Sequence, residues 1–199
     1  MKNVFEGKVG QLDILIRYLE NEDLEEMHRY INEIAKEKTY ITFQGEILSL
    51  DEERKYVNEQ VQKIANKNSV ILVVFCGNKL VGTTHLMLGV RTDRHVAQFG
   101  ITIAKEFRGN GIGKLLMKHT IDEGIKNMPD LEIVALGVFS NNKLAYEMYK
   151  DFGFTEYGKL PGGVKLADRY VDHIYMYKYF PLMAMKICHT LGNSINRSS

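Results

Sequence analysis

The sequence predicts an α+β fold, in which one mixed, mostly antiparallel sheet of about seven strands is flanked by helices. Two observations support this fold class. Short alternating or β-branched runs recur between Leu12 and Tyr179, as in strands that bury one face. Two stretches of helical periodicity follow the first run, and two more lie later in the chain. The expected order is therefore strand, two helices, three strands, helix, strand, helix and two strands.

Periodicity and turn residues place the individual elements. The first helix can be capped by Asn21, and Ser49-Leu50-Asp51-Glu52 is a capping box that opens the second. Gly77-Asn78 is a two-residue hairpin signal between two strands. A glycine-containing loop is expected over Lys159–Asp168, before the last strand. Strands are expected over 12–16, 70–76, 79–88, 95–103, 131–138 and 169–179, and helices through 24–35, 57–65, 115–125 and 145–152.

The length of 199 residues suits one domain with a sizeable core. We expect residues 1–11 to be a loose lead-in, residues 12–180 to form the domain, and residues 181–199 to be a C-terminal extension. Apolar residues of that extension, such as Leu182 and Leu191, could pack as a short helix or mediate a homodimer, and its polar end is expected to be disordered.

Composition narrows the classes of function. With 26 basic and 25 acidic residues, the net charge of +1 gives no global field that favours nucleic acid. Two cysteines, Cys76 and Cys188, cannot build a disulfide framework or a four-cysteine zinc site, and no His-x-x-x-His spacing suggests a metal. Because neither a signal peptide nor an apolar run of membrane-spanning length is visible, we expect a cytoplasmic protein without a membrane partner.

The stretch from Ile101 to Leu116 predicts a β-branched strand, a glycine-rich turn and the start of a helix. Three glycines in five residues leave backbone amides open at the helix N-terminus, where an anion such as a diphosphate can bind. A nucleotide-triphosphate loop is excluded, because Leu115 follows Lys114 where a hydroxyl should stand. The spacing of the glycines does not match the dinucleotide-binding pattern Gly-x-Gly-x-x-Gly either. The pattern that fits is Arg-x-x-Gly-x-Gly, at Arg108, Gly111 and Gly113, and its alternative is an ordinary glycine-rich turn.

A second motif lies at residues 142–154, where the sequence matches Asn-x-x-Ala-x-x-x-Tyr-x-x-x-Gly-Phe. With both motifs in order, the chain over roughly residues 12–180 resembles the GCN5-related N-acetyltransferases (GNAT). The resemblance implies acetyl-coenzyme A as co-substrate and a sheet splayed at the strand pair that holds it. Tyr170, Asp172 and Met176 are similar to the ending of the branch that acts on ribosomal proteins, polyamines and small toxic amines.

The resemblance also assigns roles to residues. Arg108 holds the motif's Gln/Arg position and can meet phosphate, or it is simply a surface arginine. Asn142 touches the pantetheine arm, caps the following helix, or does both. Tyr149 matches the tyrosine that protonates the coenzyme A thiolate, and its alternative is a core tyrosine. The implied cofactor contacts are Ile101, Thr102, Ile103, Arg108, Gly109, Asn110, Gly111, Ile112, Gly113, Lys114 and Asn142.

The acceptor site and the general base are less defined. In the family, the region corresponding to residues 40–46 forms part of the acceptor pocket, and here it is aromatic and irregular, although a packed helix connection explains it equally well. Some members carry a glutamate base five residues before the motif asparagine, where this chain has Gly137. A weakly basic acceptor or a water chain could replace a dedicated base. The candidates for the base are His85, His95, Glu46, Asp168 and Asp172.

The predicted function is acetyl-coenzyme A-dependent transfer of an acetyl group to a primary amine, on a small molecule or a protein N-terminus. The transfer is expected to be direct, in a ternary complex. The alternative is a non-catalytic module that binds or senses acyl-coenzyme A. The presence of Tyr149 favours the enzyme, and the missing glutamate at Gly137 favours the sensor.

Overall fold

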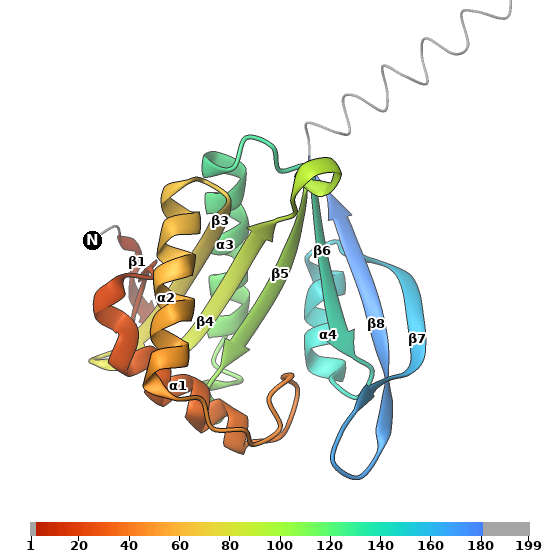
Figure 1. The fold of residues 1–199 in the computed structure, drawn as a ribbon, viewed down its shortest axis with the longest axis horizontal. Helices are drawn as coiled ribbons and strands as arrows, with labels where there is room; N and C mark the ends of the chain where they lie inside the picture. The colour runs from red at the N-terminus through yellow and green to blue at the C-terminus, as the bar shows by residue number, and fades with distance from the viewer. Residues whose placement is uncertain (1–2, 181–199) are drawn as a thin grey trace, which may run out of the picture.

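The computed structural model describes residues 3–180, which form one eight-stranded sheet with helices on both faces (Figure 1). The strand order is β1-β2-β3-β4-β5-β6-β8-β7, and neighbours are antiparallel except β5 and β6, which are parallel. This architecture confirms the predicted fold class. The elements are β1 (Asn3–Val9), β2 (Leu12–Tyr18), η1 (Asn21–Asp23), α1 (Leu24–Lys36), α2 (Leu50–Ala65), β3 (Ser69–Cys76), β4 (Lys79–Leu88), η2 (Arg91–Asp93), β5 (Val96–Ile103), η3 (Lys105–Phe107), α3 (Ile112–Asn127), β6 (Ile133–Phe139), α4 (Lys143–Asp151), β7 (Thr155–Lys165) and β8 (Tyr170–Tyr179).

The eighth strand, β1, lies in the segment that the sequence predicts as a loose lead-in. It pairs antiparallel with β2 after a turn in which Gly10 adopts a φ of +61°. Its sequence alternates poorly, because Gly7 and charged residues interrupt the apolar positions, so its periodicity gave no strand signal. The ring of Phe5 packs 5.5 Å from the ring of His119 on α3 and anchors the strand.

Two smaller expectations are also corrected. Lys159–Asp168 is not a loop, because β7 continues to Lys165 and absorbs Pro161-Gly162-Gly163 as an irregularity between Leu160 and Val164. Asn21 does not cap α1 but opens the short turn η1 before it. The capping box of α2 is confirmed, since Ser49 Oγ accepts from the Glu52 amide at 3.3 Å and Glu52 accepts from the Ser49 amide at 2.8 Å. The C-terminal extension lies outside the described residues.

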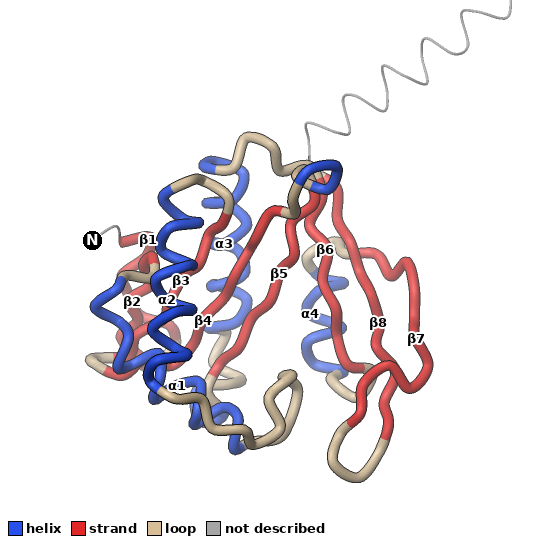
Figure 2. The backbone as a smooth tube through the Cα atoms, in the orientation of Figure 1, coloured by secondary structure: helices blue, strands red, loops and turns tan. Residues whose placement is uncertain are grey.

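The helices form two layers, one on each face of the sheet (Figure 2). Helices α1 and α2 cover one face, where Tyr30, Ile34 and Val57 pack against β3 and β4. Helices α3 and α4 cover the other face, where Leu116 and Tyr149 belong to the larger core. The sheet therefore separates an α1–α2 side from an α3–α4 side. Within residues 3–180, no helix is long and apolar enough to span a bilayer.

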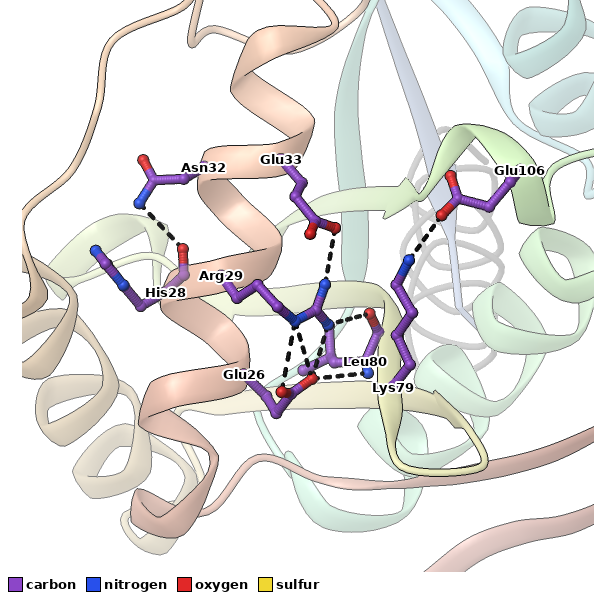
Figure 3. Close-up of polar contacts among 8 residues, drawn as sticks. All are labelled: Glu26, His28, Arg29, Asn32, Glu33, Lys79, Leu80 and Glu106. Atoms are coloured by element: carbon purple, nitrogen blue, oxygen red, sulfur yellow. Dashed lines mark hydrogen bonds and ion pairs between the residues drawn. The ribbon is translucent and has the colours of Figure 1, made fainter.

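A polar network fixes α1 on the sheet (Figure 3). Arg29 binds Glu26 and Glu33 on its own helix, each at 2.7 Å, and donates to the Leu80 carbonyl of β4 at 3.1 Å. Glu26 in turn accepts from the Leu80 amide at 3.2 Å. Both backbone groups of Leu80 are thus bonded to α1. This anchoring holds α1 in place above the strands that line the candidate site.

Candidate active site

The parallel pair β5–β6 separates along its length. Cα pairing runs from Val96 opposite Ile133 to Gln98 opposite Ala135, and the rest of β5 pairs with β4 alone while β6 continues along β8. Successive backbone groups of a strand point to opposite edges, so alternate amides of β5 beyond Gln98 face the opening without a partner strand. The predicted splay is therefore present, and it lies beside Ile101, Thr102 and Ile103.

A pocket of about 730 Å³ occupies this opening and extends to both sides of the sheet. Its walls come from β4, β5, β6, β8, α1, α2, α4 and the loop between α1 and α2, which reaches across the end of β5 in Figure 1. The residues used below that line it are Thr102, Arg108, Asn142, Tyr149, His85, Gly100, Gly137, Phe139, His173, Tyr40, Phe43 and Glu53.

The glycine-rich loop adopts the conformation that its residues allow. Gly109 and Gly111 have φ of +79° and +85°, and Gly111 is the N-cap of α3. The first amides of a helix, here from Ile112 onward, have no carbonyl partner within the helix and carry the positive end of its dipole. A Cβ on Gly113 would meet nothing closer than Met148 Sδ at 3.9 Å, so the space beside the loop is open. This geometry suits an anion.

The side chains of Arg108 and Asn110 stabilise the glycine-rich loop. Arg108 Nε donates to the Ile103 carbonyl at 2.7 Å, and Arg108 Nη2 binds Glu37 at 2.6 Å. Asn110 Nδ2 donates to the carbonyls of Phe107 and Arg108, each at 3.2 Å. Arg108 therefore ties the loop to the end of α1, and its phosphate contact stays a prediction.

Two further residues predicted to contact the cofactor, Lys114 and Thr102, interact with other side chains of the protein. Lys114 forms an exposed ion pair with Asp151 at 3.0 Å, which links α3 to α4. Tyr30 donates its hydroxyl proton to Thr102 Oγ1 at 2.9 Å and holds that side chain against α1. The contact between Thr102 and a cofactor stays a prediction.

Helix α4 presents its two motif residues to the pocket. Asn142 Oδ1 accepts from the Ala145 amide at 3.2 Å, so Asn142 does cap the helix. Tyr149 is 6% exposed, with its ring edge-on to Phe99 at 6.3 Å and tilted against Phe154 at 6.1 Å. Burial raises the pKa of Tyr149 to about 12. Its hydroxyl has no hydrogen-bond partner within residues 3–180 and stays protonated at neutral pH. Tyr149 is thus a core residue that also reaches the pocket.

The α1–α2 side of the pocket is aromatic with one buried carboxylate. Tyr40 and Phe43 of the loop contribute to this wall. The loop is held at Leu48, whose carbonyl accepts from His28 Nε2 at 2.8 Å. Glu53 is only 4% exposed, and desolvation raises the pKa of its carboxyl group, an effect that the nearby charge of His28 opposes. A bound cation would stabilise the ionised form of Glu53.

Of the five general-base candidates, His85 is the one that the described structure places on the pocket wall. His95 lies just before β5 and is not among the pocket residues, and Glu46 folds back onto the Gln44 amide. Asp172 accepts from the Gly162 amide at 3.0 Å, and Asp168 lies 4.0 Å from Arg169. No group of three potential metal ligands is found within residues 3–180.

Sequence reasoning missed several pocket residues, among them Glu53 of α2 and His173 of β8. The His173 ring lies over Gly137, so that a Cβ built on Gly137 would come within 2.2 Å of His173 Nε2. In the sequence, Gly137 marks the position at which some family members carry a glutamate. Nothing in the local sequence indicates which side chain fills the space that Gly137 leaves.

A comparison with known protein families identifies the family to which the chain belongs. The model of the acetyltransferase (GNAT) family matches residues 29–154, which include both motifs. The chain belongs to the GNAT acetyltransferase family. This confirms the resemblance carried by the two motifs and, with it, acetyl-coenzyme A as the co-substrate.

Individual relatives agree with this family. The chain is 32% identical over 120 residues to the L-amino acid N-acetyltransferase AaaT of Escherichia coli, covering 58% of this chain and 72% of AaaT. A GNAT acetyltransferase from Streptococcus pneumoniae superposes with a TM-score of 0.76 at 26% identity, covering 84% of this chain and 99% of that one. Spermidine N-acetyltransferase from Vibrio cholerae, solved with CoA and spermine, gives a TM-score of 0.68 at 27% identity, covering 83% and 95%.

Proposed function

We propose that this GNAT protein transfers the acetyl group of acetyl-coenzyme A directly to a primary amine in a ternary complex. The observation that carries the proposal is one continuous pocket, which joins the β5–β6 opening and Tyr149 to Glu53 and the α1–α2 loop. Donor and acceptor could therefore enter from opposite sides of the sheet and meet where the strands separate. Cys76, the cysteine within residues 3–180, is not among the residues of the pocket wall and so is not placed to carry an acetyl group.

The donor half follows from the open backbone groups. Amides at the start of α3 would bind the diphosphate, because they converge at the positive end of the helix dipole. Free amides of β5 would hold the pantetheine arm and polarise the thioester carbonyl. The Tyr149 hydroxyl would protonate the departing thiolate, since it is protonated at neutral pH and has no protein partner within residues 3–180.

The acceptor half is defined by Glu53 and the aromatic loop. A buried carboxylate without a hydrogen bond within residues 3–180 attracts an ammonium group, which restores the solvation that burial removes. Tyr40 and Phe43 would cover the carbon chain of the amine. The similarity to a spermidine N-acetyltransferase agrees with a small amine as acceptor.

The test is release of coenzyme A thiol from acetyl-coenzyme A in the presence of an amine panel. The panel should contain amino acids, polyamines, simple alkylamines and peptides with free N-termini. Release that depends on an amine, with the N-acetyl product detected by mass spectrometry, is expected. Binding of acetyl-coenzyme A without amine-dependent release would instead support the non-catalytic sensor.

A further inference from the structure

Two histidines lean over two glycines on the facing strands of the opening. On β4, His85 covers Gly100 of β5, where a Cβ would meet His85 Cε1 at 2.3 Å. On β8, His173 covers Gly137 of β6, where a Cβ would meet His173 Nε2 at 2.2 Å. In both cases the absence of a side chain on the inner strand lets an imidazole from the outer strand reach the rim of the splay.

The His173 ring is held by aromatic contacts rather than by hydrogen bonds. It lies edge-on to Phe139 at 5.7 Å and against Tyr175 at 4.5 Å, and neither ring nitrogen has a hydrogen-bond partner within residues 3–180. Burial lowers the pKa of His173, so the neutral form, with one nitrogen able to accept a proton, predominates at neutral pH.

Few ionisable groups surround this ring on the strands that pack against it. Tyr175 contacts it directly, and Asp172 precedes it in β8. Asp172 is occupied by the Gly162 amide at 3.0 Å and by Lys159 of β7 at 3.7 Å. The paired stretch of β6 beside it, from Gly137 to Phe139, carries no ionisable side chain. His173 is therefore a neutral imidazole exposed to the pocket.

We propose that His173 is the general base that deprotonates the acceptor amine, an inference that rests on the proposed function. The amine nitrogen attacks the thioester carbonyl carbon, and a new C–N bond forms as the C–S bond breaks. His173 takes the proton from the amine nitrogen, while Tyr149 gives its hydroxyl proton to the leaving sulfur. Water then returns a proton from the imidazolium to the Tyr149 oxygen, so that one amide and one free thiol result.

The choice between the two histidines follows from desolvation. Burial lowers the pKa of both, but His85 is far more deeply desolvated than His173. Forming an imidazolium is costlier where water is excluded, and turnover requires that the proton leaves for the solvent. His173 is therefore the better candidate for the general base, and the experiment must distinguish it from His85.

The experiment compares His173→Gln and His85→Gln in single-turnover acetyl transfer to a diamine. Its reacting amine should be weakly basic, so that it stays neutral over the pH range tested, and its second amine should be a cation that Glu53 can bind. Glutamine keeps much of the volume but cannot take up a proton. We expect His173→Gln to lose about 10²-fold or more in rate, as general bases typically contribute, with unchanged acetyl-coenzyme A affinity. His119→Gln is the matched control, because this histidine packs on Phe5 outside the pocket and should leave the rate unchanged.

A pH profile separates a base from a packing residue. Wild-type transfer should fall on the acid side with a midpoint below 6.5, the ordinary value for imidazole, since burial lowers the pKa of His173. This limb should vanish in His173→Gln, and free imidazole should restore part of the rate to His173→Ala. If the limb persists in His173→Gln, or vanishes only in His85→Gln, the assignment is overturned.

A double variant tests the contact between His173 and Gly137. Gly137→Glu alone should lose activity, because its Cβ would collide with the His173 ring. In the His173→Ala/Gly137→Glu protein a carboxylate would occupy the vacated space, and transfer should exceed that of either single variant. Equal inactivity of all three folded proteins would count against a base at this position. The proposed function fails separately, if the wild-type protein acetylates no amine at all.

Discussion

Replacing Tyr149 by phenylalanine removes one hydroxyl group and little else. The ring contacts with Phe99 and Phe154 remain, and the hydroxyl has no partner within residues 3–180 that would be left unsatisfied. We therefore expect the free energy of unfolding to change by less than about 1 kcal/mol. Tyr149→Ala would cost about 3–5 kcal/mol, as for other buried aromatic residues, and is the less informative variant.

The kinetic effect of Tyr149→Phe should be much larger. The pKa of about 12 lies above the ordinary thiol value of about 8.5, but the thiolate forms in the same desolvated opening, where burial raises its pKa as well. Proton donation in such sites contributes ~10²–10⁴-fold. We therefore expect a loss of at least ~10-fold in turnover, with acetyl-coenzyme A affinity nearly unchanged.

Single-turnover rates are the appropriate assay, because slow product release would hide a change in the chemical step. Tyr146→Phe is the matched control, since its hydroxyl donates to Glu156 on the surface at 3.0 Å and lies outside the pocket. If Tyr149→Phe transferred acetyl groups at the wild-type single-turnover rate, another group or water would protonate the thiolate. Tyr149 would then serve packing alone.

Four further predictions follow from the same contacts. Gly113→Asp should abolish coenzyme A binding in calorimetry, because it sets a carboxylate in the open space beside the loop, whereas Gly158→Asp on β7, also in open space, should bind normally. Acetyl-coenzyme A should bind equally well in chelator-treated buffer, and a strict magnesium requirement would contradict amide-based phosphate binding. Glu53→Gln should raise the KM for a cationic amine by about 10-fold, equivalent to ~1.4 kcal/mol, while Glu59→Gln on α2 should not; an unchanged KM would remove Glu53 from the acceptor site. Because the folded protein holds the Tyr149 proton with a pKa of about 12 against about 10 when unfolded, stability should fall as pH rises from 10 to 12, and urea titrations should show a smaller fall in Tyr149→Phe.

Local signals predicted the parts of the fold that local chemistry determines. Gly77-Asn78 forms the β3–β4 turn, and Ser49 with Glu52 forms the capping box of α2. The motif glycines predicted the loop, and Gly111 indeed caps α3 with a positive φ. Each of these features depends on a few adjacent residues, so the sequence carries the necessary information.

Features that depend on distant pairing were missed. β1 is a strand because β2 offers its edge, and the irregularity at Pro161–Gly163 became part of β7 because β8 pairs on both sides of it. The Arg108–Glu37 ion pair joins residues 71 positions apart. His173 reaches Gly137 because β6 and β8 pair with Phe139 opposite His173, a register that no short pattern reveals.

The most direct measurement of the central claim is the yield of N-acetylated amine and free coenzyme A from the same reaction, in wild type and Gly113→Asp. With the best acceptor of the panel, the wild-type protein should form both products in equal amounts, and no acetylated protein should be detectable by intact-mass analysis. The Gly113→Asp protein should form neither product. The claim of direct acetyl transfer would be contradicted by wild-type protein that binds acetyl-coenzyme A yet acetylates no amine, or by an acetylated protein that accumulates before the product.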